Sequence, residues 1–209
     1  MWRAVLFDLD GTLHDSDPAW QDALLALAER HELVAAAGAF EGLAGMSTPE
    51  AVALVHGRLG VAGGDVTGDV RWLEERVARR LAKRAEWHPG ALELVRQVRA
   101  RGLPTALVTS SCRQVVDGLL AALPDEPFDV VVTGDDVERM KPDPEPYLLA
   151  AKRLATDPAA CVAVEDSAMG VASAVAAGCA VVDIGRLPGR EALTAELIAR
   201  GDRGAGGGM

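Results

Sequence analysis

Residues 4–13 read AVLFDLDGTL, and they give the strongest indication of the fold. Its first four residues are an apolar run without polar alternation, which is typical of a strand buried on both faces of a parallel sheet. Two aspartates, Asp8 and Asp10, follow at once, and Gly11 permits a sharp turn after them. Because alternate residues of an extended segment point the same way, we expect both carboxylates to face one spot.

Further apolar runs of the same kind recur after long intervals, and helical patterns separate them. The expected strands are residues 105–108, 130–132, 161–164 and 180–184, and the expected helices between and after them are 91–101, 112–123, 144–154 and 168–177. Short strands that alternate with helices predict an α/β fold with a Rossmann-like, doubly wound parallel sheet. We expect the first strand to lie at the centre of that sheet.

The interval between the first and second strands is far longer than a crossover helix requires. It is helical in pattern throughout, with candidate helices at residues 18–31, 48–59 and 70–85. A capping box predicts the start of the second helix, because Ser47 can cap it, Pro49 suits its first turn and Glu50 can bond back to the cap.

This interval predicts a division of the chain into two parts. We expect residues 16–87 to form a small α-helical cap, inserted into a core made of residues 1–15 and 88–200. The Gly-rich residues 201–209 are expected to be disordered.

The composition limits the classes of function. Among 209 residues, Lys+Arg number 21 and Asp+Glu 31, which gives a formal net charge of −10. An acidic surface repels phosphate backbones and anionic headgroups, so we expect neither nucleic acid nor a membrane as a partner, and nothing indicates an obligate protein partner. With no signal peptide, no apolar run that could span a bilayer and three unpaired cysteines, we expect a cytoplasmic protein with reduced thiols.

Reactive side chains follow the expected strands at their carboxyl ends. The hydroxyls of residues 109–111 follow the second strand, Lys141 comes after the third, and Glu165 and Asp166 follow the fourth. Ligands of open parallel sheets bind beyond these ends, so the side chains should meet at one edge with Asp8 and Asp10. Carboxylates suit Mg²⁺, and Lys and Thr suit phosphoryl oxygens, so the pattern predicts a magnesium and phosphate site.

The residues at these strand ends resemble the motifs of a known family. Four motifs, DLDGTL at 8–13, VTSS at 108–111, KPDP at 141–144 and VEDSAMG at 164–170, are similar to the four ordered motifs of the haloacid dehalogenase (HAD) superfamily. The resemblance is to its β-phosphoglucomutase and phosphoglycolate phosphatase-like branch, which has a helical cap after the first motif. It implies a Mg²⁺-dependent phosphatase that hydrolyses a small phosphate monoester, of a sugar or polyol, through an aspartyl phosphate.

The resemblance also implies a role for each motif residue. Asp8 would attack phosphorus, and Asp10 would protonate the leaving alcohol and then activate water. Thr109, with nearby backbone amides, would hold the transferring group, and Lys141 would neutralise its charge and orient Asp8.

A metal site and a substrate site are implied as well. Asp8, the Asp10 carbonyl and Asp166 would bind Mg²⁺, with Glu165 contributing directly or through water. Related enzymes place specificity contacts in the loop of residues 45–48. The residues expected to contact substrate are Leu9, His14, Trp20, Gly45, Ser47 and Ser110.

Each candidate also has a purely structural interpretation. Asp8 and Asp10 are common turn residues, residues 109–111 can cap the next helix, and Lys141 can be an ordinary surface lysine. Trp20 can pack in the cap core as well as border the substrate, and residues 45–48 can be only a turn and a helix start.

Other functions compete with the phosphatase. A β-phosphoglucomutase-like phosphotransferase shares core and cap, but such mutases have His at the position of Trp20 and Arg at that of Thr48, and the missing arginine removes a bidentate phosphate clamp. A haloacid dehalogenase needs no acid at the position of Asp10, because halide leaves without protonation. A non-enzymatic phospho-acceptor module is smaller and lacks both the helical insertion and the DxDGT turn.

Overall fold

A computed structural model describes residues 2–35, 38–43, 46–61 and 63–187 of the chain. At its centre is a parallel sheet of five strands in the order β3-β2-β1-β4-β5, so the first strand is central, as predicted. The strands agree with the predicted runs to within one residue: β1 (Ala4–Phe7), β2 (Thr105–Val108), β3 (Val130–Val132), β4 (Cys161–Glu165) and β5 (Ala180–Asp183).

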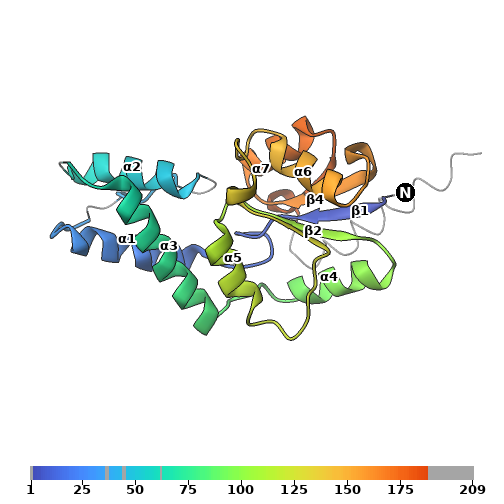
Figure 1. Cartoon of the computed structure of the whole chain (residues 1–209), viewed down its shortest axis with the longest axis horizontal. Coiled ribbons are helices and arrows are strands. Elements are labelled where there is room, and N and C mark those ends of the chain that lie inside the picture. Colours follow the sequence, from blue (N-terminus) through green and yellow to red (C-terminus); the bar gives the residue numbers. More distant parts are fainter. Residues whose placement is uncertain (1, 36–37, 44–45, 62, 188–209) are drawn as a thin grey trace, which may run out of the picture.

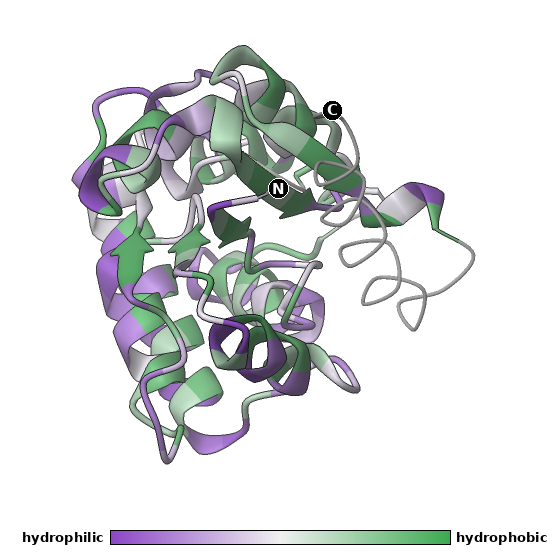
Figure 2. Ribbon diagram, turned by 90° about the vertical axis from the view of Figure 1, so that its right-hand side faces the viewer, coloured by the Kyte–Doolittle hydropathy of each residue, from purple (hydrophilic) through white to green (hydrophobic). Residues whose placement is uncertain are grey.

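Helices cover both faces of the sheet, which confirms the predicted α/β class (Figure 1). Side chains of β1 alternate between two cores, in which Val5 and Phe7 pack with α4 and α5, and Ala4 and Leu6 with α6 and α7. Figure 2 shows the apolar strands enclosed between these layers. The helices are α4 (Ala91–Ala100), α5 (Arg113–Leu120), α6 (Glu145–Arg153) and α7 (Ala168–Ala176), and single 3-10 turns are η1 (Gly134–Asp136), η2 (Pro158–Ala160) and η3 (Ile184–Arg186).

Three helices of the long insertion lie together at one end of the molecule (Figure 1). They are α1 (Asp17–Arg30), α2 (Thr48–Leu59) and α3 (Val66–Lys83), which we call the cap helices. The predicted capping box of α2 is present, since Ser47 Oγ accepts from the Glu50 amide and Glu50 Oε2 accepts from the Ser47 amide. Helix α3 starts earlier than predicted, because Asp65 caps it by accepting from the Gly68 amide at 2.9 Å.

The chain leaves and rejoins the core through two short segments that lie side by side, residues 13–15 and 86–88, which we call the neck. His14 Nε2 accepts a hydrogen bond from the Glu86 amide at 2.9 Å, and the His88 amide donates to the Leu13 carbonyl at 2.9 Å. The His14 ring is fully buried with its edge against Trp87. These contacts set the position from which the cap helices extend.

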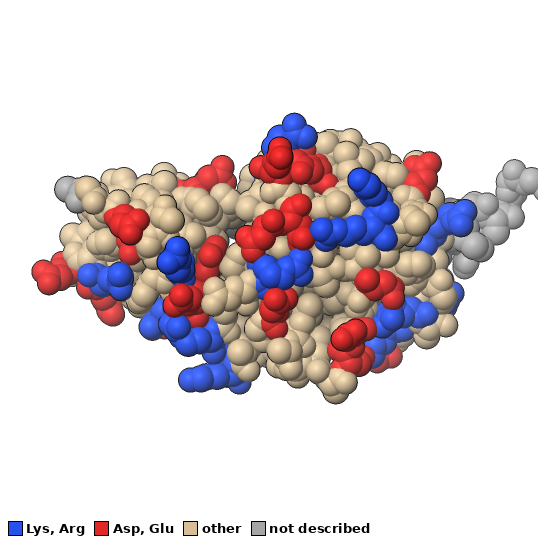
Figure 3. Space-filling model, viewed as in Figure 1, with Lys and Arg blue, Asp and Glu red and all other residues tan. Residues whose placement is uncertain are grey.

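The surface shown in Figure 3 carries charges of both signs, and the three cysteines are free thiols. Acidic and basic side chains are interspersed over the face shown in Figure 3. No described helix has both the length and the apolar character needed to cross a membrane. Burial raises the pKa of Cys112 and Cys179 to about 12 and that of Cys161 to about 11, so these free thiols stay protonated inside the protein.

Candidate active site

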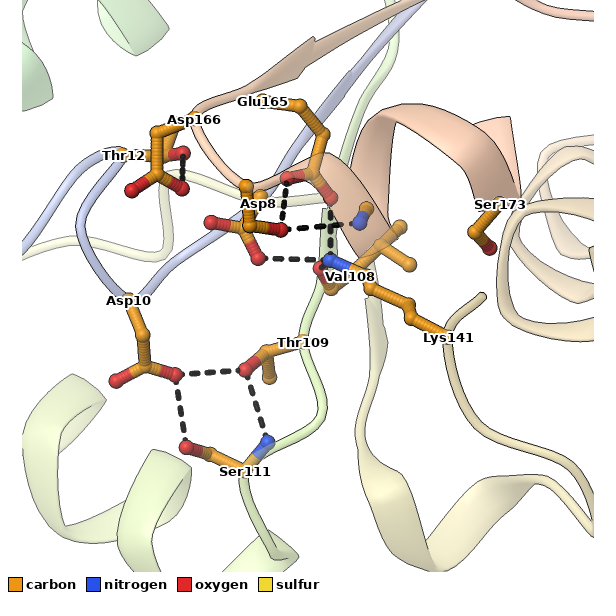
Figure 4. Close-up of polar contacts among 12 residues, drawn as sticks. Asp8, Asp10, Thr12, Val108, Thr109, Ser111, Lys141, Glu165, Asp166 and Ser173 are labelled. Atoms are coloured by element: carbon orange, nitrogen blue, oxygen red, sulfur yellow. Dashed lines mark hydrogen bonds and ion pairs between the residues drawn. The ribbon is translucent and has the colours of Figure 1, made fainter. Parts of the chain in front are cut away.

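Side chains from three neighbouring strands meet at one edge of the sheet (Figure 4). Phe7, the last residue of β1, is in register with Leu107 of β2 and Val164 of β4, so these three strands end at nearly the same level. Asp8 therefore lies beside the residues that follow β2 and those that end β4.

Lys141 joins all three of these strand ends. Its Nζ donates to Asp8 Oδ1 at 2.7 Å, to Glu165 Oε1 at 2.6 Å and to the Val108 carbonyl at 2.9 Å. Burial by itself lowers the pKa of Lys141, but Asp8 and Glu165 outweigh this effect and raise it overall. The lysine is therefore a fixed positive charge beneath the site, and not an ordinary surface lysine.

Asp8 is held by one oxygen only. Lys141 binds its Oδ1, whereas its Oδ2 is buried and has no hydrogen-bond partner among the described residues. Burial raises the pKa of Asp8, the nearby Glu165 raises it further, and Lys141 opposes both. An oriented carboxylate with one unsatisfied oxygen that lines a cavity is equipped either to attack an electrophile or to bind a cation.

Glu165 lies behind this pair and is fully buried. Its Oε1 accepts from Lys141 and, at 2.5 Å, from the hydroxyl of Tyr147, while Ser167 donates to Oε2 at 3.2 Å. A Cβ on Gly170 would lie 2.0 Å from this carboxylate, so the glycine leaves it room. Tyr147 was not predicted, because its position on the buried face of α6 marks it only as a core residue.

Asp10 is held by hydroxyls that follow β2. Thr109 Oγ1 and Ser111 Oγ donate to Asp10 Oδ2 at 3.0 and 2.8 Å, and the Ser111 amide donates to Thr109 Oγ1. Thr109 is only 2% exposed and does not line the cavity, so its contact in the structure is with Asp10, whereas the family resemblance implied one with phosphate. Ser111 belongs to the hydroxyl group of residues 109–111 predicted at this edge, although no role of its own was predicted, and it makes the shorter of the two bonds.

Asp166 completes the acidic group from the far side. Its Oδ1 accepts from Thr12 Oγ1 at 3.1 Å, and burial raises the pKa of its carboxyl group. A Cβ on Gly11 would lie 2.1 Å from Asp166 Oδ2, and Gly11 also has a φ of +82°. Only glycine permits the first motif to approach Asp166 this closely.

The acidic side chains fit a divalent cation. Asp8, Glu165 and Asp166 each offer a carboxylate oxygen, and these atoms lie within 4.8 Å of one another. Hard carboxylate oxygens are the ligands that Mg²⁺ prefers, and the unpartnered Asp8 Oδ2 is the buried atom that most needs a cation. The two oxygens of Glu165 already accept hydrogen bonds, so Asp8 and Asp166 are better placed as direct ligands.

A cavity of about 630 Å³ lies between this group and the cap helices. Its core side includes Asp8, Asp10, Ser110, Lys141 and Asp166. Its cap side is largely apolar and includes Trp20, Leu24, Leu25, Phe40, Leu43 and Met46.

The predicted substrate residues divide in two. Trp20 and Ser110 line the cavity, and Trp20 also packs against the larger apolar core, so its contact with substrate stays a prediction. Leu9, His14 and Ser47 do not line it, for three reasons: Leu9 is 1% exposed, the His14 ring serves the neck, and the Ser47 hydroxyl caps α2. Its neighbours Met46 and Thr48 face the cavity instead, and Gly45 lies outside the described residues.

Comparison with known proteins agrees with this geometry. The sequence profile of haloacid dehalogenase-like hydrolases matches residues 2–178. The chain is 37% identical to hexitol phosphatase A of Escherichia coli (strain K12) over 194 residues, 87% of this chain and 82% of that one. It is 32% identical over 177 residues to the phosphorylated carbohydrates phosphatase of Thermotoga maritima, covering 84% and 82%.

Solved structures give the same result. CbbY from Rhodobacter sphaeroides in complex with phosphate superimposes with a TM-score of 0.75 at 27% identity, covering 87% of this chain and 85% of that one. The chain therefore belongs to the haloacid dehalogenase-like hydrolases, in their branch of phosphatases with a helical cap, as its four motifs predicted.

Proposed function

We propose that this hydrolase is a Mg²⁺-dependent phosphatase that releases a small uncharged polyol or sugar from its phosphate monoester. The observation that carries the proposal is the cavity itself. On the core side of the cavity lie an oriented aspartate, Asp8, and one buried lysine, Lys141. On its cap side, no described lining residue is cationic.

Asp8 is the proposed nucleophile. One of its carboxylate oxygens would attack phosphorus as the bond from phosphorus to the leaving oxygen breaks, which forms an aspartyl phosphate. Lys141 fixes Asp8 through Oδ1 and brings a positive charge to the site in which the phosphoryl oxygens gather negative charge. Ser110 lines the cavity after β2 and is placed to donate a hydrogen bond to a phosphoryl oxygen.

Asp10 is the proposed general acid and base. It would donate its proton to the leaving oxygen, then take a proton from water as that water attacks the aspartyl phosphate and releases inorganic phosphate. Thr109 and Ser111 both donate to Oδ2, which leaves Oδ1 to face the reacting atoms. In this proposal the two hydroxyls are positioning residues for Asp10.

Asp8, Asp166 and the Asp10 carbonyl would hold Mg²⁺, with Glu165 behind them. When bound, the ion supplies positive charge that offsets the crowded carboxylates and the phosphoryl group. The cap, which we place at residues 16–87, would close over the cavity and exclude water during the first transfer.

The charges around the cavity indicate the leaving group. Lys141 is the one basic residue among the described lining residues, whereas the cap side includes the acidic Asp17 and Glu41. These carboxylates would repel a second anionic group on the substrate. Trp20 and Phe40 offer apolar rings to the carbon skeleton of a polyol or sugar.

The names of the relatives support the same class of substrate, since they are phosphatases of hexitols and of phosphorylated carbohydrates. A mutase is less well supported. Thr48 lines the cavity where the mutases have an arginine, so the second phosphate of a sugar bisphosphate would lack its clamp.

A panel of phosphate esters tests the proposal by release of inorganic phosphate with and without Mg²⁺. Hexitol and hexose monophosphates should have a kcat/KM at least about tenfold above that of phosphoglycolate, because like charges oppose binding. If phosphoglycolate were the best substrate, the proposal of an uncharged leaving group would be wrong, but the proposal of a phosphatase would stand. Isomerisation that depends on a sugar bisphosphate, without phosphate release, would establish the mutase instead.

The nucleophile has its own test. Asp8→Asn should lower phosphate release by about 10³-fold or more, because loss of a nucleophile removes the covalent route. The variant should stay folded by circular dichroism, since Lys141 keeps its contact with Glu165. Asp10→Asn should instead slow or trap the aspartyl phosphate, which intact-mass measurement detects. Near-native turnover of Asp8→Asn would refute the assignment.

A further inference from the structure

A second group of polar side chains lies inside the cap, away from the cavity. Each cap helix contributes to it: His31 directly follows α1, His56 lies on α2 and Asp69 on α3. One ligand atom of each lies within 4.8 Å of the others, and none of the three residues lines the cavity. The proposed phosphatase mechanism makes no use of them.

The geometry points both imidazoles at one oxygen. His31 Nε2 lies 2.5 Å and His56 Nε2 3.0 Å from Asp69 Oδ2. Arg30 Nε donates to the other oxygen, Oδ1, at 3.2 Å and so fixes the carboxylate with Oδ2 between the rings. An outer contact of this kind commonly orients a carboxylate that binds a metal.

His56 provides an independent indication of a ligand. Its side chain is only 8% exposed, yet Nε2 makes no hydrogen bond with any described residue, although it lies 3.0 Å from Asp69 Oδ2. A buried ring nitrogen without a partner is costly. A cation between the rings would satisfy both nitrogens and Oδ2 together.

We propose that His31, His56 and Asp69 form a Zn²⁺ site that joins the three cap helices. Two imidazole nitrogens and one carboxylate oxygen are a common donor set for zinc, which binds such ligands at about 2.0–2.2 Å. A tetrahedral ion would hold the three atoms roughly 3.3 Å apart, so each has to move by less than about 1 Å. His31 is 22% exposed, which leaves an open side for water as the fourth ligand.

Binding would stabilise the cap, because the ion links helices that are distant in sequence and binds only when they are folded. The alternative is that the three side chains form only an ion-pair network between the helices. The two interpretations differ in what a metal titration shows.

The test uses the full chain with excess Mg²⁺, so that the carboxylates of the active site are occupied. Titration with Zn²⁺ by calorimetry should show one site per chain, and Co²⁺ should give the visible absorption of a tetrahedral ion bound to imidazole. Zn²⁺ should also raise the unfolding temperature of the wild type.

Variants separate this site from the active site. His31→Gln should weaken Zn²⁺ by more than about tenfold and abolish both the Co²⁺ band and the thermal shift, and because His31 is partly exposed this variant should fold. His56→Gln should have the same effects on Zn²⁺ binding, the Co²⁺ band and the thermal shift, and circular dichroism checks that this variant is folded. The control His88→Gln alters a histidine outside the cluster, and Asp8→Asn alters the active site. Both variants should bind Zn²⁺ and Co²⁺ as the wild type does.

Two results would overturn the proposal. One is the absence of Zn²⁺ binding in excess Mg²⁺. The other is binding that survives in His31→Gln but disappears in Asp8→Asn, because the ion would then occupy the active site and the cap cluster would be an ion-pair network.

Discussion

Lys141 shows at the scale of one residue how the site tolerates buried charge. It is 8% exposed, and both of its carboxylate partners, Asp8 and Glu165, are buried as well. Desolvation of three charged groups is expensive, so the network is poor evidence for a gain in stability. Its value lies in position, because the lysine holds Asp8 by one oxygen and leaves the other free to react.

Replacing Lys141 tests this account. Lys141→Met would leave two buried carboxylates without their cation, so the free energy of unfolding should fall by about 3–5 kcal/mol. The difference in free energy of unfolding between the wild type and the variant should become smaller at acidic pH, where protonation of the carboxylates removes the unpaired charge. Urea denaturation measures this difference. Lys152→Met, an exposed lysine on α6, is the control and should change stability by no more than about 0.5 kcal/mol. A Lys141 variant as stable as the wild type would contradict the network.

At the scale of elements, the neck decides how the cap joins the core. His14 accepts a hydrogen bond from the Glu86 amide with a fully buried ring, and burial lowers its pKa below the ordinary histidine value of about 6.5. Above that pH both the folded and unfolded chains carry a neutral His14. As the pH falls through 6.5 the unfolded chain binds a proton that the folded chain does not, so stability is lost on acidification.

His14→Gln should reduce that loss, because glutamine retains an acceptor for Glu86 but does not titrate. Between about pH 7.5 and 5.5, the urea midpoint of the wild type should fall further than that of the variant. The other histidines are common to both proteins, so the difference isolates His14. Parallel pH profiles would show that His14 is protonated in the folded state too.

For the whole molecule, the orientation of cap to core depends on a contact between α3 and α5. Gly118 lies in the middle of α5, and a Cβ there would be 3.2 Å from the Ala78 carbonyl oxygen of α3. The absence of a side chain lets the last cap helix lie close on the core. Leu73 of the same helix lines the cavity, so this contact also shapes the site.

Gly118→Leu should therefore separate the two helices. We expect the free energy of unfolding to fall by about 1–3 kcal/mol, as for other overpacked interfaces, with a raised KM for the best ester of the panel. Gly57→Leu is the matched control, because Gly57 is an exposed helical glycine with nothing within 4 Å of an added Cβ. It should be neutral or stabilising by up to about 1 kcal/mol. Equal effects of the two substitutions would show that the contact contributes nothing.

The local signals in the sequence were sufficient for most of the fold. Strand bounds, the order of elements and the start of α2 follow from apolar runs, helical periodicity and the capping box, all of which act over a few residues. The start of α3 differs from the predicted residue 70, because Asp65 caps the helix and it begins at Val66. The domain boundaries stay a prediction.

For the site, the residues at the strand ends were predicted, but most of their hydrogen-bond partners were not. Local sequence is enough to show which residues follow the strands, because a motif at a strand end must lie at the edge of a parallel sheet. Tertiary structure alone decided their partners. Thr109 and Asp10 are 99 positions apart and Lys141 and Asp8 are 133 apart, so only the packed sheet brings each pair within a hydrogen bond. His14 faces the neck, and not the cavity, for the same reason, since no local pattern specifies contact with Glu86 across the insertion.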